Sequence, residues 1–244
     1  MMKISRALAA LGLVCAVGGA NAALVGRDID GNAVAGSDAS SVFLYDTVLN
    51  VTWLRNANAN GLMNWTQANT WAANLTVGSY GGWRLPTMID TGTAGCAAIA
   101  YSGTDCGYDV QTKSGNLTQY QAGQTVYSEM AHLFYVTLGN QAAYSTTGTF
   151  QPGYGLTNTG AFQNLLSNAY WSGLEYAPST NLAWYFDTNY GGQRYDDKTS
   201  SLYALAVRPG DVLAPAAVPI PAAAWLMLSG IGALGAAARR RKAK

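Results

Sequence analysis

The sequence predicts an α+β domain in which two helices come early and antiparallel strands come late. Two observations support this class. Apolar residues recur at helical spacing in residues 65–75 and 128–138, and β-rich runs separated by turn residues begin at residue 170. Helices followed by strands in this way pack on one side of an antiparallel sheet. We expect the domain to span residues 42–210.

The first half of the domain is predicted to contain a hairpin followed by a helix. Residues 42–45 and 51–54 are short β-rich runs with a short connection, which is typical of a hairpin. In residues 65–75 the apolar side chains share one helical face. Asn64 or Thr66 is positioned to cap the N-terminus of this helix.

The middle of the domain alternates between loops and a second helix. Residues 81–87 indicate a turn that leads into a buried segment, and the Gly-, Thr- and Ser-rich residues 88–125 indicate a long loop. Residues 128–138 predict the second helix, and Gly139 stands at the position that ends it. The apolar face of this helix is formed by Met130, Leu133, Phe134 and Leu138.

The last part of the domain is rich in strand signals. We expect strands at residues 170–176, 182–186, 193–195 and 202–207. The sequence Asn-Tyr-Gly-Gly at residues 189–192 is a hairpin turn between the second and third of them.

The charges are distributed unevenly along the chain. The full sequence has 14 Lys and Arg against 13 Asp and Glu, a net charge of +1. Seven basic residues and all 13 acidic ones lie between residues 23 and 217, so this part carries a charge of −6. A domain with this balance is a poor match for nucleic acid or for an anionic membrane surface.

The N-terminus is typical of a secretory signal peptide. In residues 1–22, Lys3 and Arg6 precede an apolar run, and the small residues 20–22 form a cleavage site. The alternative is a buried N-terminal helix. We assign residues 23–41 to an N-terminal extension of the domain.

The C-terminus has three parts that follow a linker at residues 211–217. A Pro-containing motif at 218–221 precedes an apolar helix at 222–238, and a basic tail fills 239–244. This order resembles the PEP-CTERM sorting signal, and its VPLPA variant in particular, with Ile220 in place of Leu. The residues that carry the resemblance are Val218, Pro219, Ile220, Pro221, Arg239, Arg240 and Arg241.

The resemblance to this signal implies a processing route and a location. The partner it implies is an exosortase, a membrane enzyme of Gram-negative bacteria that make exopolysaccharide. The protein is then exported through the Sec pathway, held in the inner membrane by the C-terminal helix and released to the cell surface or matrix. The basic tail stays in the cytoplasm. The alternative is a plain C-terminal membrane anchor.

Two cysteines, Cys96 and Cys106, lie outside the signal peptide. An exported protein experiences an oxidising environment, so we expect these two cysteines to form a disulfide that closes the long loop. Two Cys and the single His132 do not make a structural zinc site without carboxylates.

Several motifs in the domain resemble the Lcl C-terminal domain family. They occur in the expected order at residues 54–56, 82–87, 170–176, 183–186 and 206–209, and Trp-Arg-Leu-Pro-Thr is the most specific. The resemblance implies a fold related to C-type lectins, an extracellular setting and a role in adhesion or glycan binding. It does not imply a reaction. Because the domain is acidic, a neutral polysaccharide is a better expected ligand than a sulfated one.

Aromatic side chains are the candidate glycan contacts, because their flat faces match the C–H faces of sugar rings. The candidates near the predicted hairpin turn are Trp184, Tyr185, Tyr190 and Tyr195. The alternative is that the large rings form the core, which we favour for Trp83, Trp171 and Trp184.

The late strands also carry a group of carboxylates: Glu175, Asp187, Asp196 and Asp197. Carboxylate oxygens bind calcium, so calcium is the candidate cofactor, and no other is expected. The same residues would serve an alternative function, that of a polysaccharide-acting enzyme with an acid/base pair. We favour solvated hairpin charges, partly paired with Arg194 and Lys198.

The remaining charged residues point to structural roles. Arg84 and Arg208 lie beside core segments, and Glu175 is an expected partner for them. Glu129 and His132 are spaced as a local pair on the second helix. No catalytic residue is assigned. The expected function is therefore non-enzymatic: glycan binding, adhesion or structural association within exopolysaccharide.

Overall fold

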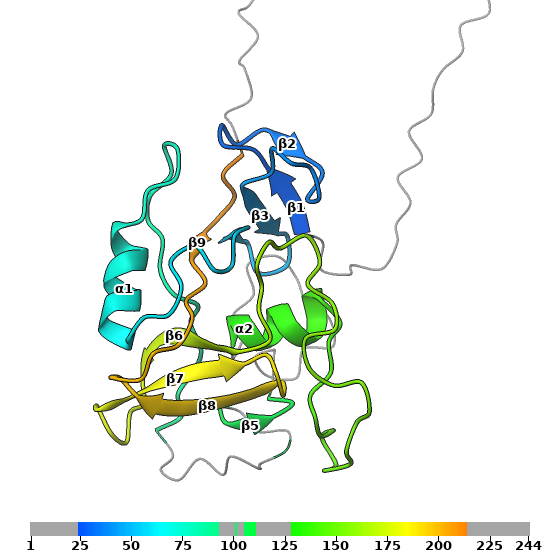
Figure 1. Ribbon diagram of the computed structural model, residues 1–244, viewed down its shortest axis with the longest axis vertical. Helices are drawn as coiled ribbons and strands as arrows, with labels where there is room; N and C mark the ends of the chain where they lie inside the picture. The colour runs from blue at the N-terminus through cyan, green and yellow to red at the C-terminus, as the bar shows by residue number, and fades with distance from the viewer. Residues whose placement is uncertain (1–23, 93–100, 102–104, 111–127, 214–244) are drawn as a thin grey trace, which may run out of the picture. The chain divides into compact units, whose positions relative to one another are not determined.

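The computed structural model describes residues 24–92, 101, 105–110 and 128–213. They form a mostly-sheet α+β domain with two antiparallel sheets and two short helices (Figure 1). The five-stranded sheet has the order β2 (Ala33–Val34), β1 (Leu24–Arg27), β3 (Phe43–Asp46), β4 (Val51–Leu54) and β9 (Val207–Pro209). The four-stranded sheet has the order β5 (Gly107–Tyr108), β8 (Gly192–Asp197), β7 (Leu182–Asp187) and β6 (Ala169–Glu175).

The predicted hairpin of β3 and β4 is confirmed. The two strands pair from Phe43 opposite Leu54 to Asp46 opposite Val51. The buried Asp46 fixes the connecting turn, because its Oδ1 accepts hydrogen bonds from the backbone N–H groups of Val48 and Leu49.

The N-terminal extension and the start of the linker both pack onto this hairpin. β1 pairs with β3 and extends the sheet. Arg27 in β1 forms a 2.7 Å ion pair with Asp211, and Val212 is buried. Segments far apart in the sequence therefore meet at this edge of the domain.

The first predicted helix is α1 (Trp65–Asn74), and Asn64 is its cap. The Asn64 side chain accepts from the backbone N–H of Gln67, and the Gln67 side chain accepts from the N–H of Asn64. This reciprocal pair satisfies two N–H groups that the helix itself leaves without partners.

The second predicted helix is present, but most of it is wound more widely than an α-helix. α2 covers only Glu129–Ala131, and a π-helix, η1, follows at His132–Thr137. The N–H of Leu138 bonds to the carbonyl of Leu133, and Gly139 ends the segment at a φ of +69°. The four apolar residues predicted for its inner face, Met130, Leu133, Phe134 and Leu138, are buried.

The late strands match the prediction except for the last. β6, β7 and β8 form an antiparallel ladder, and residues 188–191, which overlap the turn predicted at 189–192, connect β7 to β8. The strand expected at residues 202–207 is wrong in position. Leu202 and Tyr203 make single bridges to Met63 and Tyr170, two different segments, so no continuous ladder forms before β9.

The largest core cluster is shared by both sheets and the second helix. It includes Leu44 and Trp53 from β3 and β4, Phe134 from η1, and Tyr170 and Phe186 from β6 and β7. Each of these side chains is at most 1 % exposed. The core therefore lies between the sheets and holds them as one packed unit.

Several predictions concern residues outside the described part of the chain. They are the signal peptide (1–22), Cys96, the sorting motif (218–221), the apolar helix (222–238) and the basic tail (239–244). Among the described residues, no helix is long and apolar enough to span a membrane. Cys106 is buried, and its pairing with Cys96 stays a prediction.

Candidate functional site

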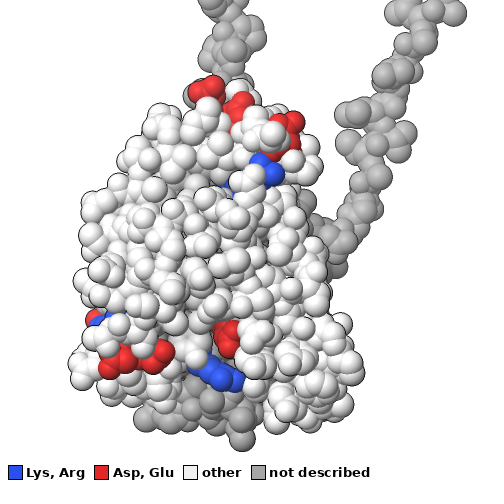
Figure 2. Space-filling view, in the orientation of Figure 1, with Lys and Arg blue, Asp and Glu red and all other residues white. Residues whose placement is uncertain are grey.

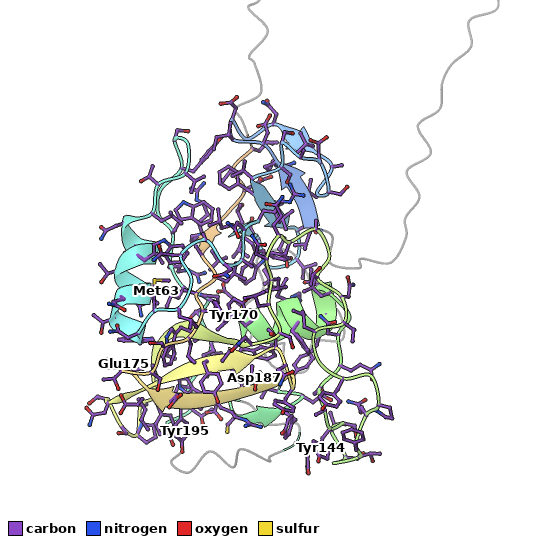
Figure 3. The ribbon with its side chains drawn as sticks, in the orientation of Figure 1. Met63, Tyr144, Tyr170, Glu175, Asp187 and Tyr195 are labelled. Carbon is purple, nitrogen blue, oxygen red and sulfur yellow. The ribbon has the colours of Figure 1, made fainter. Side chains whose placement is uncertain are left out.

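A continuous row of aromatic rings lies beside the end of the four-stranded sheet. We call it the aromatic strip, and it consists of Tyr101, Tyr108, Tyr144, Phe150, Tyr154 and Tyr190. Each ring contacts the next, with centroid distances from 5.1 Å (Tyr108–Tyr144) to 6.4 Å (Tyr101–Tyr108). Tyr154 and Tyr190 are stacked at an interplanar angle of 14°. Figure 3 shows Tyr144 at the lower right of the molecule.

Three of the six rings come from the loop at residues 141–155. The loop folds back on itself through bridges between Gln141 and Gly155 and between Tyr144 and Phe150. It docks on the β7–β8 turn, where the N–H of Ala143 bonds to the carbonyl of Tyr190 at 2.8 Å. The loop and the turn together therefore fix the positions of the rings.

Gly155 makes the close approach of this loop possible. Its φ is +88°, a conformation that side-chain-bearing residues rarely adopt. A Cβ atom at this position would lie 2.6 Å from the carbonyl oxygen of Asn189. The docking of the loop thus depends on a residue without a side chain.

Three rings of the strip are exposed to solvent, whereas Tyr108 is buried. Phe150 is 53 % exposed, and Tyr101 and Tyr190 are each 40 % exposed. Within the described residues, the hydroxyl groups of Tyr144, Tyr154 and Tyr190 make no hydrogen bond to protein. Exposed aromatic patches of this kind are common at interaction sites.

Arg194 packs on Tyr108, the ring next to Tyr101 near one end of the strip. Its guanidinium lies 5.3 Å from the centroid of the Tyr108 ring and donates to the Tyr108 hydroxyl at 2.8 Å. On the same sheet, burial raises the pKa of the Asp187 carboxyl, and the Arg194 charge opposes that rise. This end of the strip therefore combines one cation with a carboxylate held in a partly buried position.

The structure brings only one of the four predicted glycan contacts to the strip. Tyr190 belongs to it, whereas Trp184 is 1 % exposed and donates its indole N–H to Asp90. Tyr185 packs edge-on against Trp171, and Tyr195 stacks on Tyr176 with 4.0 Å between centroids. Their rings therefore mainly serve internal packing.

The core interpretation of the large tryptophans is confirmed. Trp83 is 3 % exposed, and Trp171 and Trp184 are buried still more deeply. The indole N–H groups of Trp83 and Trp171 donate to the backbone carbonyls of Tyr80 and Met63. These bonds remove the cost of burying a polar indole group.

The four carboxylates of the late strands each have a local partner. Glu175 pairs with Lys198. Asp187, Asp196 and Asp197 accept from the nearby backbone N–H groups of Asn189, Asp197 and Thr199, respectively. In the described part of the chain, no three His, Cys, Asp or Glu side chains lie close enough together to hold a metal ion.

The expected pairing of Arg84 with Glu175 is wrong. Arg84 instead forms two 2.7 Å hydrogen bonds to the two carboxylate oxygens of Glu129. Glu129 also accepts from the backbone N–H of Thr87. It therefore ties the Trp-Arg-Leu-Pro-Thr segment to the second helix, and it raises the pKa of Arg84.

Two related predictions are also wrong. Glu129 faces Arg84, so the expected Glu129–His132 pair is wrong. His132 is fully buried, and its Nδ1 lies 3.3 Å from the hydroxyl of Thr137. Arg208 does not reach Glu175 either; its guanidinium lies over the Tyr80 ring, 5.5 Å from the centroid.

Sequence reasoning missed most of the strip, because Tyr144, Phe150 and Tyr154 lie in a stretch without regular periodicity. The available signal was their combination with Gly148, Gly153 and Gly155, which have positive φ and shape the loop. Aromatic residues between such glycines indicate a shaped loop that presents its rings.

The fold and the strip define a class: a small, mostly-sheet α+β domain with an exposed aromatic surface. The family model of the Lcl C-terminal domain matches residues 43–208 of this chain. This is more than half of the sequence, and the chain belongs to the Lcl C-terminal domain family. A comparison with curated proteins finds no match.

Proposed function

We propose that this protein is an exported, non-enzymatic protein that binds neutral polysaccharide outside the cell through the aromatic strip. The observation that carries the proposal is the run of six contacting rings with Phe150, Tyr101 and Tyr190 exposed. Sugar rings have C–H faces with partial positive charge, which pack favourably on the negative faces of aromatic rings. The hydroxyls of Tyr144, Tyr154 and Tyr190 then bond to the sugar hydroxyls.

Charge supports a neutral ligand over a polyanionic one. The region between residues 23 and 217 carries −6, and Arg194 is the basic group beside the described strip. The face shown in Figure 2 has only a few small groups of charged residues. A surface of this kind lacks the clustered cations that a sulfated or phosphorylated polymer requires.

We also propose a fold of the C-type lectin kind and a matrix location. Support for the fold comes from membership of the Lcl C-terminal domain family and from the two antiparallel sheets with two helices. Support for the location comes from the signal-peptide pattern in residues 1–22 and the PEP-CTERM-like residues 218–244. Removal of the C-terminal segment by an exosortase predicts a surface form without Lys244, and intact-mass spectrometry of that form tests it.

The binding proposal is tested with a Phe150→Ala/Tyr190→Ala double variant and a matched control. Ile29→Ala removes another exposed apolar side chain, 42 % exposed, from the β1–β2 turn outside the strip. Retention on columns of neutral glucans, with and without calcium, should fall at least tenfold for the double variant. It should stay unchanged for Ile29→Ala. Equal retention of all three proteins would contradict the assignment of the strip.

A further inference from the structure

A second surface, on α1, also has the chemistry of a sugar site. An open groove of about 460 Å³ lies there, within the size range of small-ligand sites. Leu62, Met63 and Trp71 provide its apolar lining, and the polar lining is uncharged: Asn60, Thr66, Gln67 and Thr70. We call it the α1 groove, and it shares no residue with the aromatic strip.

The groove is built by helical geometry and one long-range contact. Thr66 and Thr70, and likewise Gln67 and Trp71, are four residues apart on α1, so their side chains are neighbours on one face. The preceding segment is held against the domain by paired backbone hydrogen bonds between Met63 and Leu202. The chain before the helix thus forms the opposite wall, where Leu62 is 55 % exposed.

Three polar groups of the groove, on Thr66, Thr70 and Trp71, are available to a ligand. The indole N–H groups of Trp65, Trp83, Trp171 and Trp184 each donate to a protein acceptor. Within the described residues, the indole N–H of Trp71 and the hydroxyls of Thr66 and Thr70 make no such bond. The groove therefore offers donors and acceptors beside an apolar ring.

This combination selects for a neutral, hydroxyl-rich ligand. The lining contains no charged side chain, so nothing in it compensates the desolvation of an ionic ligand. A pyranose ring has an apolar C–H face for Trp71 and Leu62 and hydroxyl groups for Thr66, Thr70 and the indole N–H. Few precisely placed polar groups around an apolar surface are typical of small-ligand sites.

The two surfaces lie at opposite edges of the four-stranded sheet. The edge strands of this sheet are β5 and β6. α1 packs against β6, and the strip contacts β5 through Tyr108. Three strand spacings separate these edges, roughly 14 Å. In Figure 3, Met63, which lines the groove, and Tyr144 of the strip lie on opposite sides of the sheet.

We propose that the α1 groove is a second binding site for neutral saccharide and that one molecule thereby bridges two polysaccharide segments. The bridging rests on the proposed function of the strip, whereas saccharide binding in the groove does not. Two sites on one rigid domain convert weak single contacts into tight attachment to a polymer.

The groove is tested by titrating the purified protein with cellohexaose and maltohexaose in a calorimeter. The background is the Phe150→Ala/Tyr190→Ala variant, so that the remaining binding reports the groove. Thr70→Val, which keeps the shape and removes the hydroxyl, should weaken this binding about three- to tenfold. Thr76→Val, an exposed threonine beyond the end of α1 and outside the groove, is the matched control and should change nothing.

A second measurement reports Trp71 directly. The indole N–H signal of Trp71, assigned with Trp71→Phe, should shift on addition of the saccharide that binds, while the signal of the buried Trp184, which donates to Asp90, stays in place. No shift of the Trp71 signal together with equal affinities of the Thr70 and Thr76 variants would overturn the groove assignment.

The outcomes separate the two proposals. Binding lost in the strip variant alone supports the proposed function and overturns the groove. Binding lost in the groove variants alone supports the groove and overturns the strip. No binding of either hexasaccharide to the wild-type protein overturns both. If both sites bind, wild-type protein should aggregate a long neutral glucan by light scattering, and either single-site variant should not.

Discussion

At the residue scale, the two oxygens of Glu129 join two segments that lie more than 40 residues apart in the sequence. They accept from Arg84 and from the backbone of Thr87 and so join the family's Trp-Arg-Leu-Pro-Thr segment to the second helix. The Glu129 side chain is 8 % exposed, compared with 36 % for Arg84. A partly buried charge pair of this kind is costly to break by removing one partner.

Glu129→Ala should therefore lower the free energy of unfolding by about 2–3 kcal/mol, because it leaves Arg84 and the Thr87 N–H without their acceptor. Urea denaturation measures this. Glu175→Ala is the matched control: it removes the 47 % exposed partner of Lys198 and should cost less than about 1 kcal/mol. Equal losses in the two variants would refute the structural role of Glu129.

His132 predicts a pH dependence at the same scale. Burial lowers its pKa from 6.5 to about 4. Below about pH 6.5 the unfolded chain binds a proton on this residue that the folded protein does not bind until about pH 4. The free energy of unfolding should therefore fall as the pH drops through this window, by up to about 3 kcal/mol.

The measurement is the urea midpoint between pH 4 and 7 for wild type and for His132→Gln, which cannot titrate there. The variant should show a smaller decrease on acidification. An identical pH profile for both proteins would mean that His132 is not the group responsible.

At the scale of elements, the 141–155 loop determines the shape of the aromatic strip. Substituting two of its glycines separates the effect of backbone strain from the effect of a steric clash. Gly153 and Gly155 have φ values of +83° and +88°, but a Cβ on Gly153 would meet no atom within 4 Å, whereas one on Gly155 would lie 2.6 Å from the Asn189 carbonyl oxygen.

Gly155→Ala should therefore cost about 2–3 kcal/mol and reduce binding of neutral glucan, because the loop must leave the β7–β8 turn. Gly153→Ala carries the backbone strain alone and should cost about 1 kcal/mol with binding retained. Urea denaturation and glucan affinity columns give the two readouts. Equal effects on binding would show that the docked loop is not needed for the strip.

At the scale of the whole molecule, the shared core predicts cooperative unfolding. Both sheets contribute large side chains to the cluster around Phe134, whose ring lies 5.3 Å from that of Phe186. The largest buried cluster needs residues from both sheets, so the two should unfold together.

The wild-type protein should show one urea transition, with the same midpoint by far-ultraviolet circular dichroism and by tryptophan fluorescence. Phe134→Ala should lower both midpoints equally and cost about 3–5 kcal/mol, because it opens a cavity where the sheets meet. Separate midpoints for the two probes would indicate that the sheets are independent units.

The local elements of this protein could be predicted from its sequence because their causes are local. Asn64 and Gln67 cap α1 within one turn, and the turn at Asn189–Gly192 follows from residues that tolerate its backbone. The burial of Trp83 and Trp171 could be anticipated from their size and neighbours. The last strand was misplaced because its bridging partners, Met63 and Tyr170, lie more than 30 residues away.

The sequence by itself determined the α+β class, the acidic charge of the domain, most of its hairpins and helices, and the residues by which the family is recognised. Only the tertiary structure decided that Arg84 pairs with Glu129, that Trp184 and Tyr195 pack internally, and that Tyr144, Phe150 and Tyr154 meet Tyr190 in one strip. The physical reason is the sequence distance over which each kind of interaction acts. Capping, turns and periodicity act over a few residues, whereas ion pairs, ring stacking and grooves depend on which distant segments the core brings together.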